Sequence, residues 1–79
     1  MKKIQIVKAT DGYLLECFFD DGSTRMADIK PYLQTEAFQP LQDITIFKRV
    51  KNNQYYVSWR NEEVDLSADT LWHIGKVIN

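Results

Sequence analysis

The sequence is poor in the residues on which many metal and catalytic sites depend. Its 79 residues include one cysteine, one histidine and three glycines. A single thiol excludes an internal disulfide, and one thiol with one imidazole falls short of the ligands that a structural zinc ion needs. The glycines do not form a phosphate-binding loop, because each falls at a turn or a helix end. We therefore expect no metal site, no cofactor and no enzymatic activity.

An excess of one charge and a long apolar run are also missing. Ten basic and eleven acidic residues leave a net charge of −1, whereas nucleic-acid-binding domains usually carry a marked basic excess. No apolar run approaches the ~18 residues that cross a bilayer. Lys2 and Lys3 are not followed by the apolar stretch of a signal peptide. Together with the unpaired Cys17, these absences predict a cytoplasmic protein without membrane contact.

The apolar content is sufficient for one folded core. Apolar residues make up 44% of the chain and aromatic residues 13%, which excludes a disordered tail. A chain of this length buries only about 60–65% of the surface that it exposes when unfolded. We expect a single domain over residues 1–79, of class α+β, with a mainly antiparallel sheet and short helices.

Alternating apolar residues predict six strands separated by polar turns. Ile4 and Ile6 are expected to share a face of the first strand, and Tyr55, Val57 and Trp59 a face of the fifth. The second strand is expected to be central and covered on both faces. Asp11–Gly12 is a strong hairpin signal. The predicted strands cover residues 3–9, 13–19, 24–29, 43–51, 55–60 and 63–66.

Three short helical segments are expected between and after these strands. Pro31 suits the first turn of a helix at residues 30–33, and Thr35 would cap a second segment at 36–42. Ser67 would cap the last helix, over residues 67–78, which we expect to end near Gly75 and to face the core through Leu71, Trp72 and Ile74.

One unit of strand, turn, strand, aspartate and helix occurs twice. In the first copy the strand ends at Phe19 and the aspartate is Asp28; in the second copy they are Trp59 and Asp65. We predict that both aspartates lie at strand-to-helix junctions, where a carboxylate accepts from free backbone N–H groups. The alternative, a catalytic pair of carboxylates, lacks a matched base, nucleophile or oxyanion donor.

Only residues 47–60 combine basic and aromatic side chains. Single-stranded nucleic-acid platforms use this combination, whereas a structural hairpin would turn its aromatic residues into the core and its charges to the edge. Asp69 and His73 lie one helical turn apart and are expected to form a surface pair, because one His and one Asp make neither a metal site nor a catalytic triad. Candidate nucleic-acid contacts are Lys48, Arg49, Lys51, Tyr56 and Arg60.

Several of these motifs also resemble domain-of-unknown-function family 2442. The likeness covers nearly the whole chain and includes F-x-D-G, an Asp-apolar pair and a Trp, Asn, Asp-Leu pattern that is spaced W-x-N-x-x-x-D-L in this chain. Glu62 departs from it, because the family commonly has Gly after the Asn. The matching positions are Phe19, Gly22, Asp28, Phe38, Leu41, Phe47, Trp59, Asn61, Asp65, Leu66, Asp69, Leu71 and Trp72.

The resemblance implies a small bacterial α+β module with no established activity. Some members are fused to helix-turn-helix domains, and others are neighbours of a second small protein in toxin–antitoxin pairs. We therefore expect a protein-interaction or regulatory module that binds another small protein, as an antitoxin would, or a second copy of itself. The alternative is a nucleic-acid-associated accessory protein that uses residues 47–60. The structural positions of this pattern are Phe19, Gly22, Asp28, Trp59, Asp65, Ser67 and Trp72.

Overall fold

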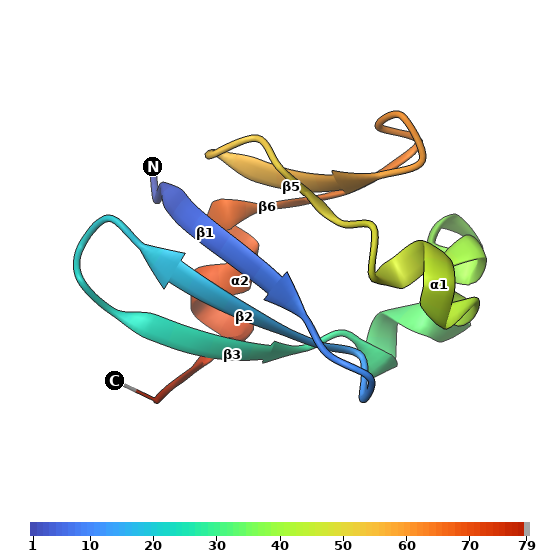
Figure 1. Ribbon diagram of the computed structural model, residues 1–79, viewed down its shortest axis with the longest axis horizontal. Coiled ribbons are helices and arrows are strands. Elements are labelled where there is room, and N and C mark those ends of the chain that lie inside the picture. Colours follow the sequence, from blue (N-terminus) through green and yellow to red (C-terminus); the bar gives the residue numbers. More distant parts are fainter. Residues whose placement is uncertain (79) are drawn as a thin grey trace.

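A computed structural model describes residues 1–78 and contains two antiparallel sheets with short helices (Figure 1). The class is α+β, as predicted. The four-stranded sheet has the order β1-β2-β3-β7, and the three-stranded sheet has the order β4-β5-β6. The strands are β1 (Ile4–Ala9), β2 (Leu14–Phe19), β3 (Thr24–Asp28), β4 (Lys51–Asn52), β5 (Tyr56–Trp59), β6 (Val64–Ser67) and β7 (Lys76–Val77). The helices are η1 (Lys30–Gln34), η2 (Glu36–Gln42), α1 (Ile44–Phe47) and α2 (Ala68–Ile74).

Two tight hairpins join β1, β2 and β3 of the four-stranded sheet. Asp11 and Gly12 connect β1 to β2, and the left-handed residue of this turn is Tyr13, at φ 61°. The β2–β3 turn has Gly22 at φ 88°, a conformation that glycine adopts without steric cost. A register shift between Ile4 and Ile6 places Ile4 opposite Phe19 and Ile6 opposite Phe18. The two isoleucines therefore lie on opposite faces, and the prediction that they share one is wrong.

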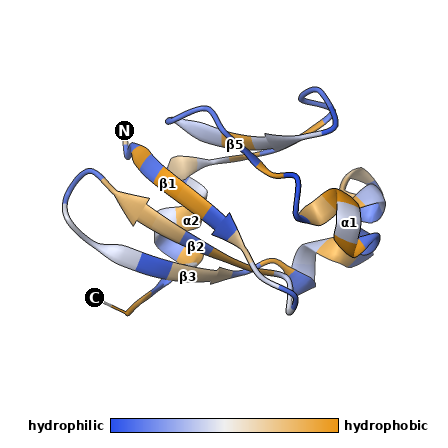
Figure 2. Ribbon diagram, in the orientation of Figure 1, coloured by the Kyte–Doolittle hydropathy of each residue, from blue (hydrophilic) through white to orange (hydrophobic). Residues whose placement is uncertain are grey.

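One hydrophobic core lies between the sheets and is covered by α2 (Figures 1 and 2). The alternate residues Leu15, Cys17 and Phe19 of β2 enter it, and the other face of β2 is only half-buried, so this strand is covered on one face rather than two. The core residues are Ile4, Leu15, Cys17, Phe19, Ala27, Ile29, Leu41, Phe47, Val57, Trp59, Val64, Leu66, Ala68 and Leu71.

The largest departure from the sequence prediction is at residues 43–51, expected to be one strand. Residues Ile44–Phe47 form α1 instead, and only Lys51–Asn52 are extended. The Asp43 carboxylate caps this helix by accepting from the Thr45 N–H at 2.9 Å. Helix formation lets the Phe47 carbonyl accept from the Trp59 indole N–H at 2.8 Å inside the core. Tertiary contacts thus override the β propensity of the isoleucines and threonine.

Smaller differences occur at three other elements. Thr35 does not cap η2, because its hydroxyl donates back to the Tyr32 carbonyl at 2.7 Å. Tyr55 precedes β5 and is exposed, so it does not share the inward face of Val57 and Trp59. The last helix ends at Ile74, which is exposed, and residues 76–77 form β7 against β3.

The repeated unit is matched in its order of elements, since a strand, a turn, a strand and a helix occur at 14–34 and again at 56–74. Asp28 ends β3 and accepts from the Lys30 N–H at 3.0 Å, as predicted. Asp65 instead lies within β6, opposite Ser58, and the residue that caps α2 is Ser67. The two aspartates are therefore not equivalent, and the duplication itself stays a prediction.

Ser67→Ala is expected to lower the free energy of unfolding by about 1 kcal/mol, because it removes an N-cap. The Ser67 hydroxyl accepts from the Thr70 N–H at 3.0 Å. His73→Ala on the exposed surface of the same helix is the matched control, with an expected change of a few tenths of a kcal/mol. Urea denaturation of both variants measures the difference. A Ser67→Ala midpoint equal to that of the wild type would contradict the capping role.

Candidate functional site

The four-stranded sheet leaves one face without a covering helix. Cross-strand register aligns side chains on this open face in rows that run across the strands. An apolar row contains Ile6 and Phe18. The row continues through the buried Thr24 to Ile78, because the Ile78 N–H donates to the Thr24 carbonyl at 2.9 Å. The neighbouring row contains Lys8, Glu16, Met26 and Lys76. We call these two rows, with Leu14 and Asp28, the open sheet face.

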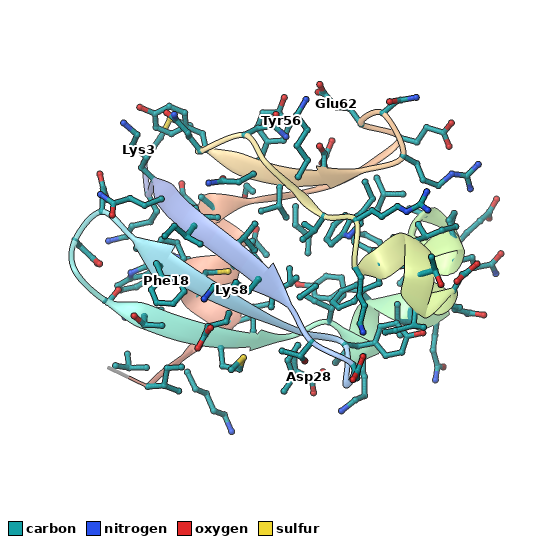
Figure 3. The ribbon with its side chains drawn as sticks, viewed as in Figure 1. Lys3, Lys8, Phe18, Asp28, Tyr56 and Glu62 are labelled. Atoms are coloured by element: carbon teal, nitrogen blue, oxygen red, sulfur yellow. The ribbon has the colours of Figure 1, made fainter. Side chains whose placement is uncertain are left out.

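Apolar side chains on the open sheet face are accessible. Ile6 is 51% exposed and Ile78 is 50% exposed, while Phe18, Leu14 and Met26 are half-buried. Figure 3 shows the labelled Lys8 and Phe18 over the same face, with α2 behind the sheet. The Lys8 ammonium lies 5.5 Å from the centroid of the Phe18 ring. The open face therefore presents an apolar row bordered by charges of both signs.

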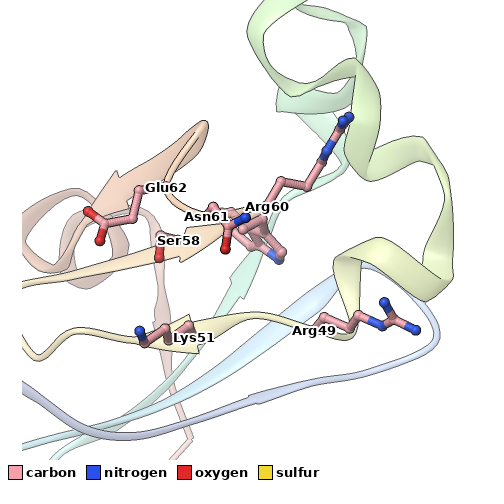
Figure 4. A pocket seen from close by; sticks show the side chains of 7 residues that line it. Arg49, Lys51, Ser58, Arg60, Asn61 and Glu62 are labelled. Carbon is pink, nitrogen blue, oxygen red and sulfur yellow. The ribbon is translucent and has the colours of Figure 1, made fainter.

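A second surface feature is a pocket of about 410 Å³ on the outer side of the three-stranded sheet (Figure 4). Its walls come from three segments: the end of the turn after α1, the paired strands β4 and β5, and the β5–β6 turn. Lys51 and Ser58 are cross-strand partners, so both face this side. The lining residues are Arg49, Lys51, Ser58, Trp59, Arg60, Asn61 and Glu62.

The β5–β6 turn has an unusual backbone. Arg60, Asn61 and Glu62 have φ values of 53°, 54° and 69°, so three consecutive non-glycine residues are left-handed. Two side-chain contacts accompany this conformation. The Tyr56 hydroxyl donates to Glu62 Oε1 at 2.8 Å, and Arg60 Nε lies 3.7 Å from Glu63 Oε2. The hydrogen bond from Tyr56 to the Glu62 carboxylate raises the pKa of Tyr56.

Glu62→Gly is expected to stabilise the fold by roughly 0.5–1 kcal/mol, because glycine adopts a left-handed conformation without the steric cost that a Cβ brings. Glu62→Gln keeps a hydrogen-bond acceptor and the strained backbone, and serves as the control with little expected change. Midpoints of chemical denaturation compare the two. A lower midpoint for Glu62→Gly would mean that the bond from Tyr56 outweighs the relief of strain.

The structure gathers three of the five candidate nucleic-acid residues. Arg49, Lys51 and Arg60 line the pocket, whereas the Lys48 ammonium forms an ion pair with Asp11 at the β1–β2 turn. The Tyr56 hydroxyl is engaged with Glu62. Trp59 is 1% exposed, so its ring cannot stack on a base. The aromatic residue of this hairpin that is exposed is Tyr55, outside the strand.

Trp72, a position of the family pattern, is the centre of a cluster that sequence reasoning missed. The Arg25 guanidinium lies 3.7 Å from the Trp72 ring centroid and the Lys2 ammonium 3.9 Å from it. The indole N–H donates to Asp21 Oδ2 at 3.2 Å. Hydrogen bonds from Ser23, with that from Trp72, lower the pKa of Asp21 to about 2. No local pattern could indicate a cluster whose members come from three distant segments, namely the N-terminus, the β2–β3 hairpin and α2.

The remaining positions of the pattern are structural. Phe19 is buried in the core, Gly22 supplies the left-handed turn residue, and Ser67 caps α2. Burial raises the pKa of the Cys17 thiol to about 12, so this thiol stays protonated near neutral pH.

The Asp69 carboxylate, one turn before His73, accepts from the Lys2 N–H at 2.6 Å. Within residues 1–78, no three His, Cys, Asp or Glu side chains converge as metal ligands would. Across the same residues, no helix is long and apolar enough to cross a membrane.

Comparison with known protein families gives a match over most of the chain. The model of a family described as "Protein of unknown function (DUF2442)" matches residues 4–77, nearly the whole chain. No curated protein and no solved structure matches the chain.

Proposed function

Because the chain belongs to the DUF2442 family, whose function is unknown, we propose a function from its surface: a small interaction module whose open sheet face binds a second copy of the same protein. The observation that carries this proposal is the apolar row of Ile6, Phe18 and Ile78 on a face that no helix covers. Contiguous apolar patches on a small protein commonly mark interaction sites.

The charges on the open sheet face favour an identical partner. Lys8 and Lys76 are matched in number by Glu16 and Asp28, so two copies of this face do not repel each other. A two-fold contact uses the same patch on both subunits, and therefore needs a patch that is complementary to itself. A face with charges of one sign would instead favour a partner of opposite charge.

The area of the open sheet face sets the affinity that we expect for the dimer. Strand spacing and rise give a face of roughly 20 Å by 20 Å, or about 400 Å² per copy. Two copies would then bury about 800 Å² in total, less than the roughly 1,200–2,000 Å² of stable interfaces. We therefore propose a weak dimer that forms at high protein concentration and dissociates on dilution. Such a reversible contact suits a regulatory role.

Sedimentation equilibrium over a wide concentration range tests the proposal. Ile6→Lys places a charge in the apolar row and should raise the dimer dissociation constant at least about tenfold, since it loses apolar burial and buries an ammonium group. Ile74→Lys is the matched control, because Ile74 is exposed on α2, away from the open sheet face. It should leave the dissociation constant unchanged. Equal effects of both substitutions, or a monomer at every concentration, would contradict the second copy as occupant.

A heterologous partner, such as the toxin of an antitoxin-like pair, would give a different result. The wild type and Ile74→Lys would then each capture one discrete small protein from the source cells, and Ile6→Lys would not, while the purified protein stays monomeric. The nucleic-acid alternative has less support, because Lys48 is paired with Asp11 and Trp59 is buried. We further propose that the protein acts in the cytoplasm and catalyses no reaction of its own.

A further inference from the structure

We propose that the pocket between β4, β5 and the β5–β6 turn binds a phosphate group, carried by a small metabolite or by the end of a nucleic-acid strand. This site lies on the three-stranded sheet and is independent of the open sheet face. The cavity of about 410 Å³ falls within the range of roughly 300–1,000 Å³ that small-molecule sites occupy.

The pocket is rich in hydrogen-bond donors that the protein itself does not use. Among the described residues, Arg49 and Lys51 take part in no ion pair, and the Asn61 side-chain amide forms no hydrogen bond. Arg60 forms an ion pair with Glu63, in which the Arg60 Nε lies 3.7 Å from Glu63 Oε2. The three cations outnumber the one lining carboxylate, Glu62, which already accepts from Tyr56. A ligand that offers acceptors and negative charge would complement these groups.

Ser58 supplies a donor at the floor of the pocket. Its side chain is nearly fully buried, and its Oγ accepts from Asn53 Nδ2 at 2.8 Å. A hydroxyl group that accepts one bond still has its own hydrogen to donate. Within residues 1–78 this hydrogen has no protein acceptor, although the serine is 2% exposed. A ligand oxygen that reaches the floor would satisfy it.

The cations occupy the rim. Figure 4 shows Arg49 and Lys51 on the segment facing β5 and the Arg60–Glu62 turn, with Ser58 on β5 across from Lys51 and the two guanidinium groups extending toward the helical side of the molecule. Guanidinium groups bind phosphate through paired N–H donors, and an ammonium group binds it as a point charge. A phosphate has three terminal oxygens to share among rim cations and floor hydroxyl, whereas a carboxylate has two. The number of donors and their separation therefore favour a phosphate over a carboxylate as the ligand.

Amide chemical shifts of the ¹⁵N-labelled protein, titrated at constant ionic strength, test the proposal. The probes are inorganic phosphate, a sugar monophosphate, and a single-stranded oligonucleotide with or without a terminal phosphate. We expect saturable shifts at Ser58, Asn61 and Glu62. Lys51→Gln and Arg49→Gln should each weaken binding at least about tenfold, the ratio that follows from the loss of one charge-assisted hydrogen bond. Both residues are exposed, so the fold should tolerate either change.

Lys30→Gln is the matched control, since it removes one exposed positive charge on η1, outside both the pocket and the open sheet face, and should change affinity less than about twofold. Binding of the sugar monophosphate alone identifies a metabolite as the source, and binding that requires the terminal phosphate of the oligonucleotide identifies a strand end. Equal weakening by all three substitutions would reveal only general charge attraction and would overturn the proposal. The absence of saturable shifts with every probe would overturn it as well.

Discussion

Trp59→Ala is expected to lower the free energy of unfolding by roughly 3–5 kcal/mol, the usual cost of truncating a large buried aromatic side chain. Trp59 is 1% exposed. Its ring stacks on Phe47 with centroids 6.0 Å apart and meets Phe38 edge-on at 6.5 Å. The substitution also leaves the buried Phe47 carbonyl without the indole N–H that it accepts from at 2.8 Å. A domain of this size has little stability to spare, so much of the population should unfold.

Circular dichroism during urea denaturation measures this loss without depending on tryptophan emission. Trp59→Phe removes the N–H donor and one ring of the indole but retains a six-membered aromatic ring, so it should cost less than the alanine variant. Tyr55→Ala is the matched surface control, because Tyr55 is 45% exposed, and its midpoint should stay close to that of the wild type. A midpoint for Trp59→Ala equal to that of Tyr55→Ala would refute the central role of Trp59.

Gly75→Ala is expected to destabilise the protein by roughly 1–3 kcal/mol through crowding. The backbone conformation is not the reason, since φ is −74° and any residue could adopt it. A Cβ at this position would lie 2.7 Å from the Leu71 carbonyl oxygen and 2.9 Å from Arg25 Cβ. One of these atoms belongs to the backbone and the other is a Cβ, so neither can move aside as the end of a flexible side chain could. The pairing of β7 with β3 should therefore loosen.

Gly12→Ala provides the comparison, because a Cβ there would meet no heavy atom within 4 Å. It should be neutral or slightly stabilising, since alanine reduces the freedom of the unfolded chain. Hydrogen exchange gives a local readout: the Ile78 amide, which donates to the Thr24 carbonyl, should exchange faster in Gly75→Ala and at the wild-type rate in Gly12→Ala. Unchanged protection of Ile78 in Gly75→Ala would show that the chain accommodates the methyl group at no cost.

Elements whose signals are local could be predicted from the sequence. Alternation identified β2, Asp11–Gly12 and Gly22 marked the turns of the first sheet, and Ser67 marked the start of α2. Each depends on residues close together in the chain. The bulge after Ile4 could not be foreseen, because the register of β1 is fixed by the side chains of β2.

Helix α1 was missed because its local signals conflict. Its isoleucines and threonine favour a strand, while Asp43 favours a helix start, and the choice is made by the distant Trp59 indole that binds the Phe47 carbonyl. The same contact explains the partial failure at the candidate site. The basic and aromatic residues of segment 47–60 suggest a stacking platform as one alternative. Trp59 is buried, however, and the basic residues Arg49, Lys51 and Arg60 line a pocket instead.

The pairing of β7 with β3 has a consequence for synthesis on the ribosome. The first three strands can associate early, because their hairpins join neighbours in the chain. The core cannot close until residues 68–77 emerge, since α2 covers the sheet, Arg25 bonds the carbonyls of Trp72 and Gly75, and the Lys2 N–H bonds Asp69. During elongation, at roughly 5–20 residues per second, the nascent sheet therefore exposes both faces. During this interval a chaperone that binds exposed apolar surface can hold the inner face of the sheet, which the core has not yet closed.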